Sequence, residues 1–281
     1  MDTLNCCELE KLVEAGHTLF KAIEGRDLAY EILKKFVECG YRPYSNINQD
    51  LDKLKEEVDN WIDYNEEKKE AIKGFIETIK GSPTLGSLAL LFLLSWNMNR
   101  YKDCDNFSKE KLEEYAKHLN EELEKILSSL EFLKDRTIKD VEWKEIRKDL
   151  EEIEEILKSK QIIVCFKKNC SDCQHEYIGA IKLASVFLPN IVIPIDNPIA
   201  EALCLKNPKQ PFSLKIYEEF WGKIKELTER CPNLVTKLKY IDELFYVLFS
   251  LKQKVRNSMR EKFGFTVRDY HGKIKNCRNN S

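Results

Sequence analysis

Apolar residues recur every three or four positions along most of this chain, the spacing that places them on one face of an α-helix. Two such stripes run from Leu9 to Ile23 and from Ala29 to Val37. Two more run from Leu51 to Ile62 and from Ile72 to Ile79, and the breaker Gly81-Ser82-Pro83 ends the series. The first part of the chain is therefore predicted to be helical.

The longest apolar run, Leu85 to Trp96, contains no charged residue. It is shorter than the roughly 20 residues that a membrane-spanning helix needs. We therefore interpret it as a central helix that is buried on all sides, and we expect no contact with a membrane.

A heptad-like pattern follows, from Leu112 to Leu133 and again from Trp143 to Leu157. Two such stretches with a short break between them predict an antiparallel helical hairpin. Thr137, with Asp140 three residues later, is the expected N-cap of the second helix. The glutamate-rich outer faces are interpreted as solvated surface, or alternatively as the binding face of a coiled coil.

Near the C-terminus, Ser213 is expected to cap a helix that carries Phe220 and Trp221 and ends at Cys231-Pro232. A long final helix is predicted from Leu234 to Val255, packed against the preceding one as a second hairpin. Cys231 is interpreted as a structural residue.

The segment Gln161 to Ala200 has a different pattern. The apolar runs 162–166 and 191–195 are typical of strands, and a helix is predicted between them from Tyr177 to Leu188. A strand, a helix and a second strand in so short a space predict a parallel crossover. The fold class predicted is mainly α, with helical hairpins and a small inserted α/β unit.

These patterns divide the chain into four regions. They are an N-terminal helical region (1–106), the antiparallel hairpin (107–160), the small α/β unit (161–206), and a C-terminal helical hairpin with a basic tail (207–281).

The α/β unit contains Cys170-Ser171-Asp172-Cys173 just before its helix. The positive end of a helix dipole stabilises a thiolate, and Lys167 and Lys168 add to this, so the pKa of Cys170 is expected to fall below its ordinary value. The strand, the lysine-containing turn and the Cys-x-x-Cys resemble the thioredoxin and glutaredoxin families over residues 161–200. That resemblance implies that Cys170 is the nucleophile and Cys173 the resolving thiol in disulfide exchange.

A metal site is the alternative for the same cysteines. Cys165, Cys170, Cys173 and Cys204 have a spacing close to that of plant-type [2Fe–2S] ferredoxins. Zinc is the other candidate, with Cys170, Cys173 and His175 as ligands and Cys204 or Cys165 as the fourth. The third alternative is an inert cysteine pair at a helix start.

Composition limits the class of protein. With 43% hydrophobic and 33% charged residues, the chain is expected to be globular. Its first ten residues do not resemble a secretory signal, so we expect a cytoplasmic protein whose ten cysteines are mostly reduced thiols.

The segment Lys252 to Ser281 is basic, with nine Lys and Arg residues and two acidic ones in a chain whose formal net charge is −2. Interleaved Phe263, Phe265 and Tyr270 offer rings on which bases stack, so the stretch Lys252–Arg278 is a candidate nucleic-acid contact. Two functions follow from the sequence. One is a thiol–disulfide protein that acts through Cys170 and Cys173, and the other is a non-enzymatic helical scaffold or binding protein with a protein partner.

Overall fold

The computed structural model describes residues 5–24, 27–61, 64–96, 101, 107–159, 176–207 and 210–250. Helices dominate this part of the chain, and no residue in it forms a β-strand. The α-helices are α1 (Cys6–Glu24), α2 (Asp27–Glu38), α3 (Ile47–Glu57), α4 (Glu66–Ile79), α5 (Leu85–Trp96), α7 (Lys109–Leu133), α8 (Trp143–Ser159), α9 (Tyr177–Phe187), α10 (Asn197–Ala202), α11 (Leu214–Arg230) and α12 (Leu238–Phe245). The mainly α prediction is confirmed.

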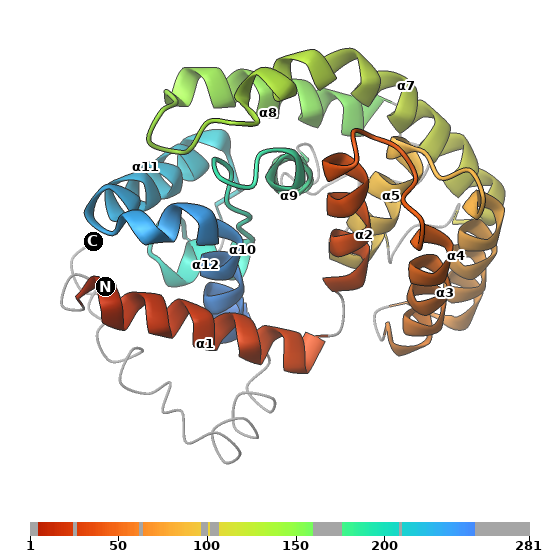
Figure 1. Cartoon of the computed structure of the whole chain (residues 1–281), viewed down its shortest axis with the longest axis horizontal. Helices are drawn as coiled ribbons and strands as arrows, with labels where there is room; N and C mark the ends of the chain where they lie inside the picture. The colour runs from red at the N-terminus through yellow and green to blue at the C-terminus, as the bar shows by residue number, and fades with distance from the viewer. Residues whose placement is uncertain are drawn as a thin grey trace.

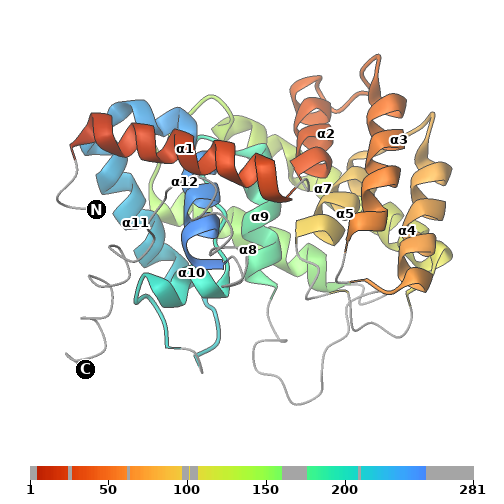
Figure 2. The same cartoon turned by 90° about the horizontal axis from the view of Figure 1, so that it is seen from below.

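The helices surround one large hydrophobic core to which elements from α1 to α12 all contribute, and Leu19, Phe20 and Val247 form a small second cluster. Figure 1 shows α9 near the middle of the molecule, with α7 and α8 arching over one side and α1 lying along the other. The view at right angles shows α1 crossing α12, while α2 to α5 gather at the opposite end (Figure 2). The two ends of the described chain therefore lie side by side.

Helix α5 is the centre of the N-terminal half, as predicted. All of its residues from Leu85 to Ser95 are buried. Gly86 allows a close approach to α7, because a Cβ atom at this position would overlap the carbonyl oxygen of Ala116 and the backbone nitrogen of Asn120. No helix in the described part of the chain is long and apolar enough to cross a membrane.

The hairpin prediction is also confirmed. The hydroxyl of Tyr115 on α7 donates to the carbonyl oxygen of Leu157 on α8 at 2.8 Å, and Ser129 donates to Asp149 at 3.3 Å. Residues later in α7 thus pair with residues earlier in α8, so the two helices run antiparallel.

The predicted cap of α8 is wrong by several residues. Helix α8 begins at Trp143, and Thr137 lies in the preceding loop. The backbone N–H and the hydroxyl of Thr137 both donate to Asp140 Oδ2, at 3.0 and 2.6 Å. These bonds close a turn in the loop, which is a common alternative use of a threonine and an aspartate at this spacing.

The predicted strand at residues 191–195 is also wrong. This segment is buried but irregular, and side chains from α11 satisfy its backbone. The Tyr217 hydroxyl accepts from the N–H of Ile193 and donates to its carbonyl oxygen, at 3.2 and 3.1 Å, and Trp221 Nε1 donates to Ile191 at 3.0 Å. A buried backbone needs hydrogen bonds but not a neighbouring strand. The predicted first strand, 162–166, lies outside the described residues, and the inserted α/β unit is not supported.

The final helix is less regular than predicted. Residues Pro232–Lys237 form a 3₁₀ helix (η3), α12 follows, and Tyr246–Ser250 form a π-helical turn (η4). Helix α11 does begin after the predicted cap, because the Ser213 hydroxyl accepts from the N–H of Ile216, and it ends at Arg230 before the Cys231-Pro232 pair.

Candidate functional site

Most of the residues predicted to form a site lie outside the described part of the chain. These are Cys165, Cys170, Cys173, His175 and the basic stretch Lys252–Arg278. Cys204 is described, and it is exposed in the turn after α10 with a φ of +58°. Among the described residues, no three His, Cys, Asp or Glu side chains are grouped so that they could hold a metal ion. The redox and metal roles therefore stay predictions.

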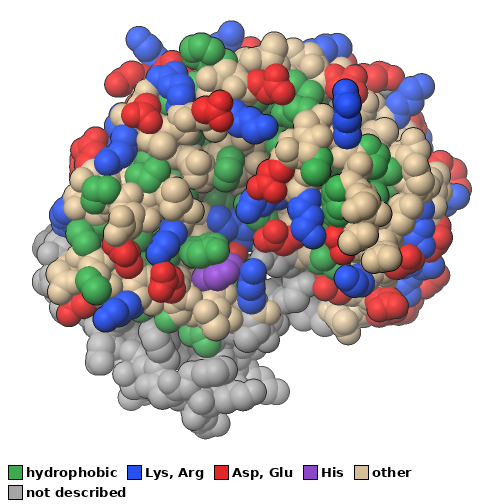
Figure 3. All heavy atoms as spheres, in the orientation of Figure 1, with side chains coloured by type: hydrophobic (Ala, Val, Ile, Leu, Met, Phe, Trp, Pro, Cys, Tyr) green, Lys and Arg blue, Asp and Glu red, His purple; other side chains and the backbone are tan. Residues whose placement is uncertain are grey.

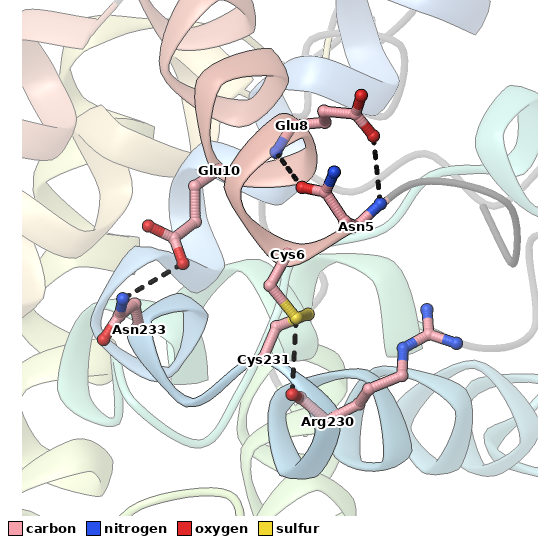
Figure 4. Close-up of a disulfide and its surroundings, with 7 residues drawn as sticks. All are labelled: Asn5, Cys6, Glu8, Glu10, Arg230, Cys231 and Asn233. Carbon is pink, nitrogen blue, oxygen red and sulfur yellow. Dashed lines mark hydrogen bonds between the residues drawn. A yellow bond between two sulfur atoms is a disulfide. The ribbon is translucent and has the colours of Figure 1, made fainter.

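Two of the cysteines, which were expected to be mostly reduced thiols, are bonded to each other. Cys6, the first residue of α1, forms a disulfide with Cys231 at the end of α11, across 225 positions of sequence. Figure 4 shows the bond and its neighbours. Cys231 does have the structural role that was predicted for it, but its covalent partner was not predicted.

A group of charged side chains that the sequence patterns did not predict comes from α1, α9, α12 and the residue before α10. We call it the inner charge cluster. Its members are His17, Lys182, Asp196, Lys239, Asp242 and Glu243.

Glu243 is the most deeply buried member, with no exposed side-chain surface. One of its carboxylate oxygens contacts Nδ1 of His17 on α1, and the other accepts from the ammonium group of Lys239. A buried carboxylate is costly unless such partners replace its water. Glu243 therefore holds together α1 and α12, whose sequences lie at opposite ends of the described chain.

Both partners of Glu243 are themselves placed by aromatic rings. The His17 ring stacks on Tyr240 with 3.7 Å between ring centroids. Lys239 Nζ lies 4.3, 4.4 and 5.2 Å from the ring centroids of Trp96, Tyr30 and Phe20. A cation within about 6 Å of an aromatic face is attracted by the ring. Three rings from α5, α2 and α1 thus surround one ammonium group.

Asp242 follows Lys239 by three positions on α12 and is also buried. Burial raises its pKa well above the usual range for a carboxyl group, with Asp196 and Glu243 adding to this rise and Lys239 and Lys182 opposing it. The protonated, neutral form of Asp242 is therefore favoured. A carboxyl group in that state donates a hydrogen bond as well as accepting one.

Lys182 and Asp196 bring the two further segments to the cluster. Lys182 is the only charged residue of α9, and its ammonium group donates to the carbonyl oxygen of Trp96, the last residue of α5, at 2.6 Å. A cation at this end of a helix is stabilised by the helix dipole. Asp196 caps α10 by accepting from the N–H of Ile199 at 3.2 Å.

The face of the molecule above this region is hollowed. Figure 3, in the orientation of Figure 1, shows a hollow near the middle of the face, in the area bounded by α2, α9 and α12. Hydrophobic and basic side chains are visible in the hollow, and acidic side chains stand at its rim. His17 and Lys239 retain 17% and 12% of their side-chain surface, so part of the cluster remains within reach of a solute.

One sequence signal points to the cluster. Each of Lys182, Asp242 and Glu243 is a charged residue within a helical stretch that is otherwise mostly apolar, and His17 lies between the buried residues Val13 and Phe20 on the apolar face of α1. Such residues are rarely buried without partners. The partners themselves, up to 226 positions away, have no signal in a single sequence.

We compared the chain with models of protein families, with characterised proteins and with solved structures, and none of the three comparisons gave a match.

Proposed function

We propose that this protein is a non-enzymatic helical binding protein whose ligand, a small zwitterion such as a free amino acid, binds at the inner charge cluster. The observation that carries the proposal is the convergence of charged side chains from four separate segments beneath a hollow in the surface. Concave sites with a few convergent polar groups and a perturbed pKa are where ligands bind most often.

The charges of the cluster favour a ligand that carries both signs. The raised pKa of Asp242 favours its neutral form, and with Asp242 neutral the formal charges of the two lysines, Lys182 and Lys239, cancel those of Asp196 and Glu243. A ligand with a net charge would disturb this balance in a place of low dielectric constant. A zwitterion brings an ammonium group for the carboxylates and aromatic rings, and a carboxylate for the lysines.

The aromatic rings support the same ligand class. Trp96, Tyr30 and Phe20 already surround the ammonium group of Lys239. An alkylammonium group is therefore compatible with this part of the molecule, and the ring faces stabilise it without adding a formal charge.

Calorimetric titration of the full chain with each of the twenty amino acids tests the proposal. We expect at least one to bind, and we expect Lys239→Met and Glu243→Gln to weaken binding about tenfold or more, because each removes a hydrogen bond to a charged group. Lys223→Met is the control, since Lys223 forms an exposed pair with Glu219 on α11.

Two results would overturn the proposal. One is that no amino acid binds with a Kd below about 1 mM, a free energy of about −4 kcal/mol. The other is that Glu243→Gln and Lys239→Met bind as tightly as Lys223→Met does.

A further inference from the structure

The N-terminal helix α1 is held at one end by a covalent bond and along its length by contacts with the last part of the described chain. It packs on α12 and also touches η3 and η4. Its surface polar contacts there are Glu10 with Asn233 at 3.1 Å and Glu14 with Lys237 at 2.7 Å. Exposed pairs of this kind stabilise a structure little.

We propose that the Cys6–Cys231 disulfide is a redox latch that holds α1 over the inner charge cluster, so that reduction by a dithiol loosens α1 and widens the access of the ligand to the cluster. The statement about the ligand rests on the proposed function. The loosening of α1 does not, because it can be measured without any ligand.

Helix α1 is part of the cover of the cluster. It supplies His17, which contacts Glu243, and Phe20, whose ring faces Lys239. Because Glu243 has no exposed side-chain surface, displacement of α1 would give a buried carboxylate access to water. Renewed hydration of a charged group offsets part of the contact energy that is lost. The His17–Glu243 contact thus resists the displacement of α1, and hydration of Glu243 lowers the cost of that displacement.

The position of Cys6 suits both redox states. In Figure 4, Cys6 Sγ lies next to the carbonyl oxygen of Arg230, 3.3 Å away. A disulfide sulfur has no hydrogen to donate, but the reduced thiol of Cys6 has this acceptor at hand. The start of α1 is capped independently of the disulfide, since Asn5 and Glu8 exchange side-chain and backbone hydrogen bonds of 3.0 Å each.

The exchange reaction has a preferred direction of attack. Cys231 is 1% exposed, whereas Cys6 is partly exposed, so a thiolate of the dithiol bonds to the Cys6 sulfur. The S–S bond breaks, and Cys231 leaves as a thiolate and takes up a proton. The second thiol of the reductant then attacks the reductant sulfur in the mixed disulfide.

This second step releases Cys6 and completes the reduction of the disulfide. The reductant becomes a disulfide, and the protein gains two electrons and two protons. Cys6 leaves as a thiolate at the first position of a helix, where the unpaired N–H groups and the dipole stabilise negative charge before it is protonated.

Hydrogen exchange measured by mass spectrometry on the full chain, with and without dithiothreitol and with no ligand present, tests the latch. We expect amides of α1 and of α12 to exchange about tenfold faster or more after reduction, and to regain protection after reoxidation. The Cys6→Ser variant should show the faster rate in both conditions. Cys7→Ser is the control, because Cys7 is an exposed thiol next to Cys6 that takes no part in the bond.

Two outcomes would overturn the latch. One is that exchange in α1 does not respond to reduction, and the other is that reduction accelerates exchange equally in all helices, which indicates a general loss of stability. A latch that passes this test, combined with an absence of amino-acid binding in both redox states, would refute the proposed ligand and leave the latch standing.

Discussion

The α7–α8 pair joins two helices that follow one another in the sequence, whereas the α1–α12 pair joins the two ends of the described chain. In the first pair most charges are exposed, as in the Arg147–Glu151 contact, where the side chains retain 56% and 44% of their surface. In the second, Glu243 is fully buried between His17 and Lys239. The packing of α7 on α8 thus depends mainly on the apolar stripe of each helix. The packing of α1 on α12 depends in addition on buried charges and a disulfide.

The comparison predicts that removing one carboxylate has very different effects in the two pairs. Glu243→Ala should lower the free energy of unfolding by about 3 to 5 kcal/mol, because it leaves Lys239 and His17 buried without their partner. Glu151→Ala should lower it by less than about 1 kcal/mol. Urea denaturation of both variants measures the difference, and similar losses in the two would contradict the assignment of Glu243 as the link between α1 and α12.

The next largest loss of stability is expected from a substitution where α1 packs closely on α12. A methyl group at Gly16 would lie 2.7 to 2.8 Å from the Cβ, Cα and Cδ1 atoms of Leu244, so Gly16→Ala should cost about 1 to 3 kcal/mol. Gly222 on α11 is the matched control, because no heavy atom outside the adjacent residues and backbone of its own helix lies within 4 Å of a Cβ atom built there. Gly222→Ala should instead stabilise by up to about 1 kcal/mol through helix propensity.

Thermal denaturation distinguishes these two glycines by the sign of the change in Tm. A rise in Tm for Gly16→Ala would show that α1 can move away from α12 at no cost.

Protonation of Asp242 has a smaller effect on the free energy of unfolding, and that effect depends on pH. The pKa of Asp242 is raised in the folded protein, so above about pH 4 the unfolded chain releases this proton more readily than the folded one. The free energy of unfolding therefore falls by at most about 1.4 kcal/mol per pH unit as the pH rises. The fall ends once the pH passes the pKa of Asp242 in the folded protein. Asp242→Asn removes this loss, so its advantage over the original chain should grow from pH 4 to pH 8.

The α7–α8 pair contains the control for this effect. Burial also raises the pKa of Asp149, but a hydrogen bond from Ser129 opposes the rise, so Asp149→Asn should show the same sign with a shallower slope. Urea denaturation at several pH values measures both slopes. If the advantage of Asp242→Asn is constant from pH 4 to pH 8, Asp242 is not protonated in the folded state.

The last prediction concerns reactivity and not stability. If Cys170 is the nucleophile of a thiol–disulfide site, it should be alkylated by iodoacetamide with a midpoint near or below about pH 7, and Cys170→Ser should abolish that reaction. Metal analysis of anaerobically purified protein is the companion measurement. Zinc or iron that is lost in Cys170→Ser would favour the metal site, and slow alkylation without metal would favour an inert cysteine pair.

Local patterns in the sequence predicted most of the helices. The stripe from Leu112 to Leu133 and the run from Leu85 to Trp96 became α7 and α5 as expected, because an amphipathic or apolar stretch of that length has few other ways to bury its side chains. The apolar run 191–195 was misread as a strand for a related reason. Its burial was predictable, but its hydrogen-bond partners were the remote side chains of Tyr217 and Trp221.

For the inner charge cluster, a single sequence predicts that certain charged residues are buried but does not predict which residues they contact. Lys182 within an apolar helix and His17 on an apolar face mark buried positions that require partners. Which partners they meet depends on how α1, α9 and α12 pack.

The sequence by itself determined that this protein is helical, where most of its helices lie and which of their faces are buried, because these properties depend on residues three or four positions apart. Only the tertiary structure decided that Cys6 bonds to Cys231 and that Glu243 lies between His17 and Lys239. Contacts between residues more than 200 positions apart depend on how the whole chain folds. A pattern of residues three or four positions apart does not contain that information.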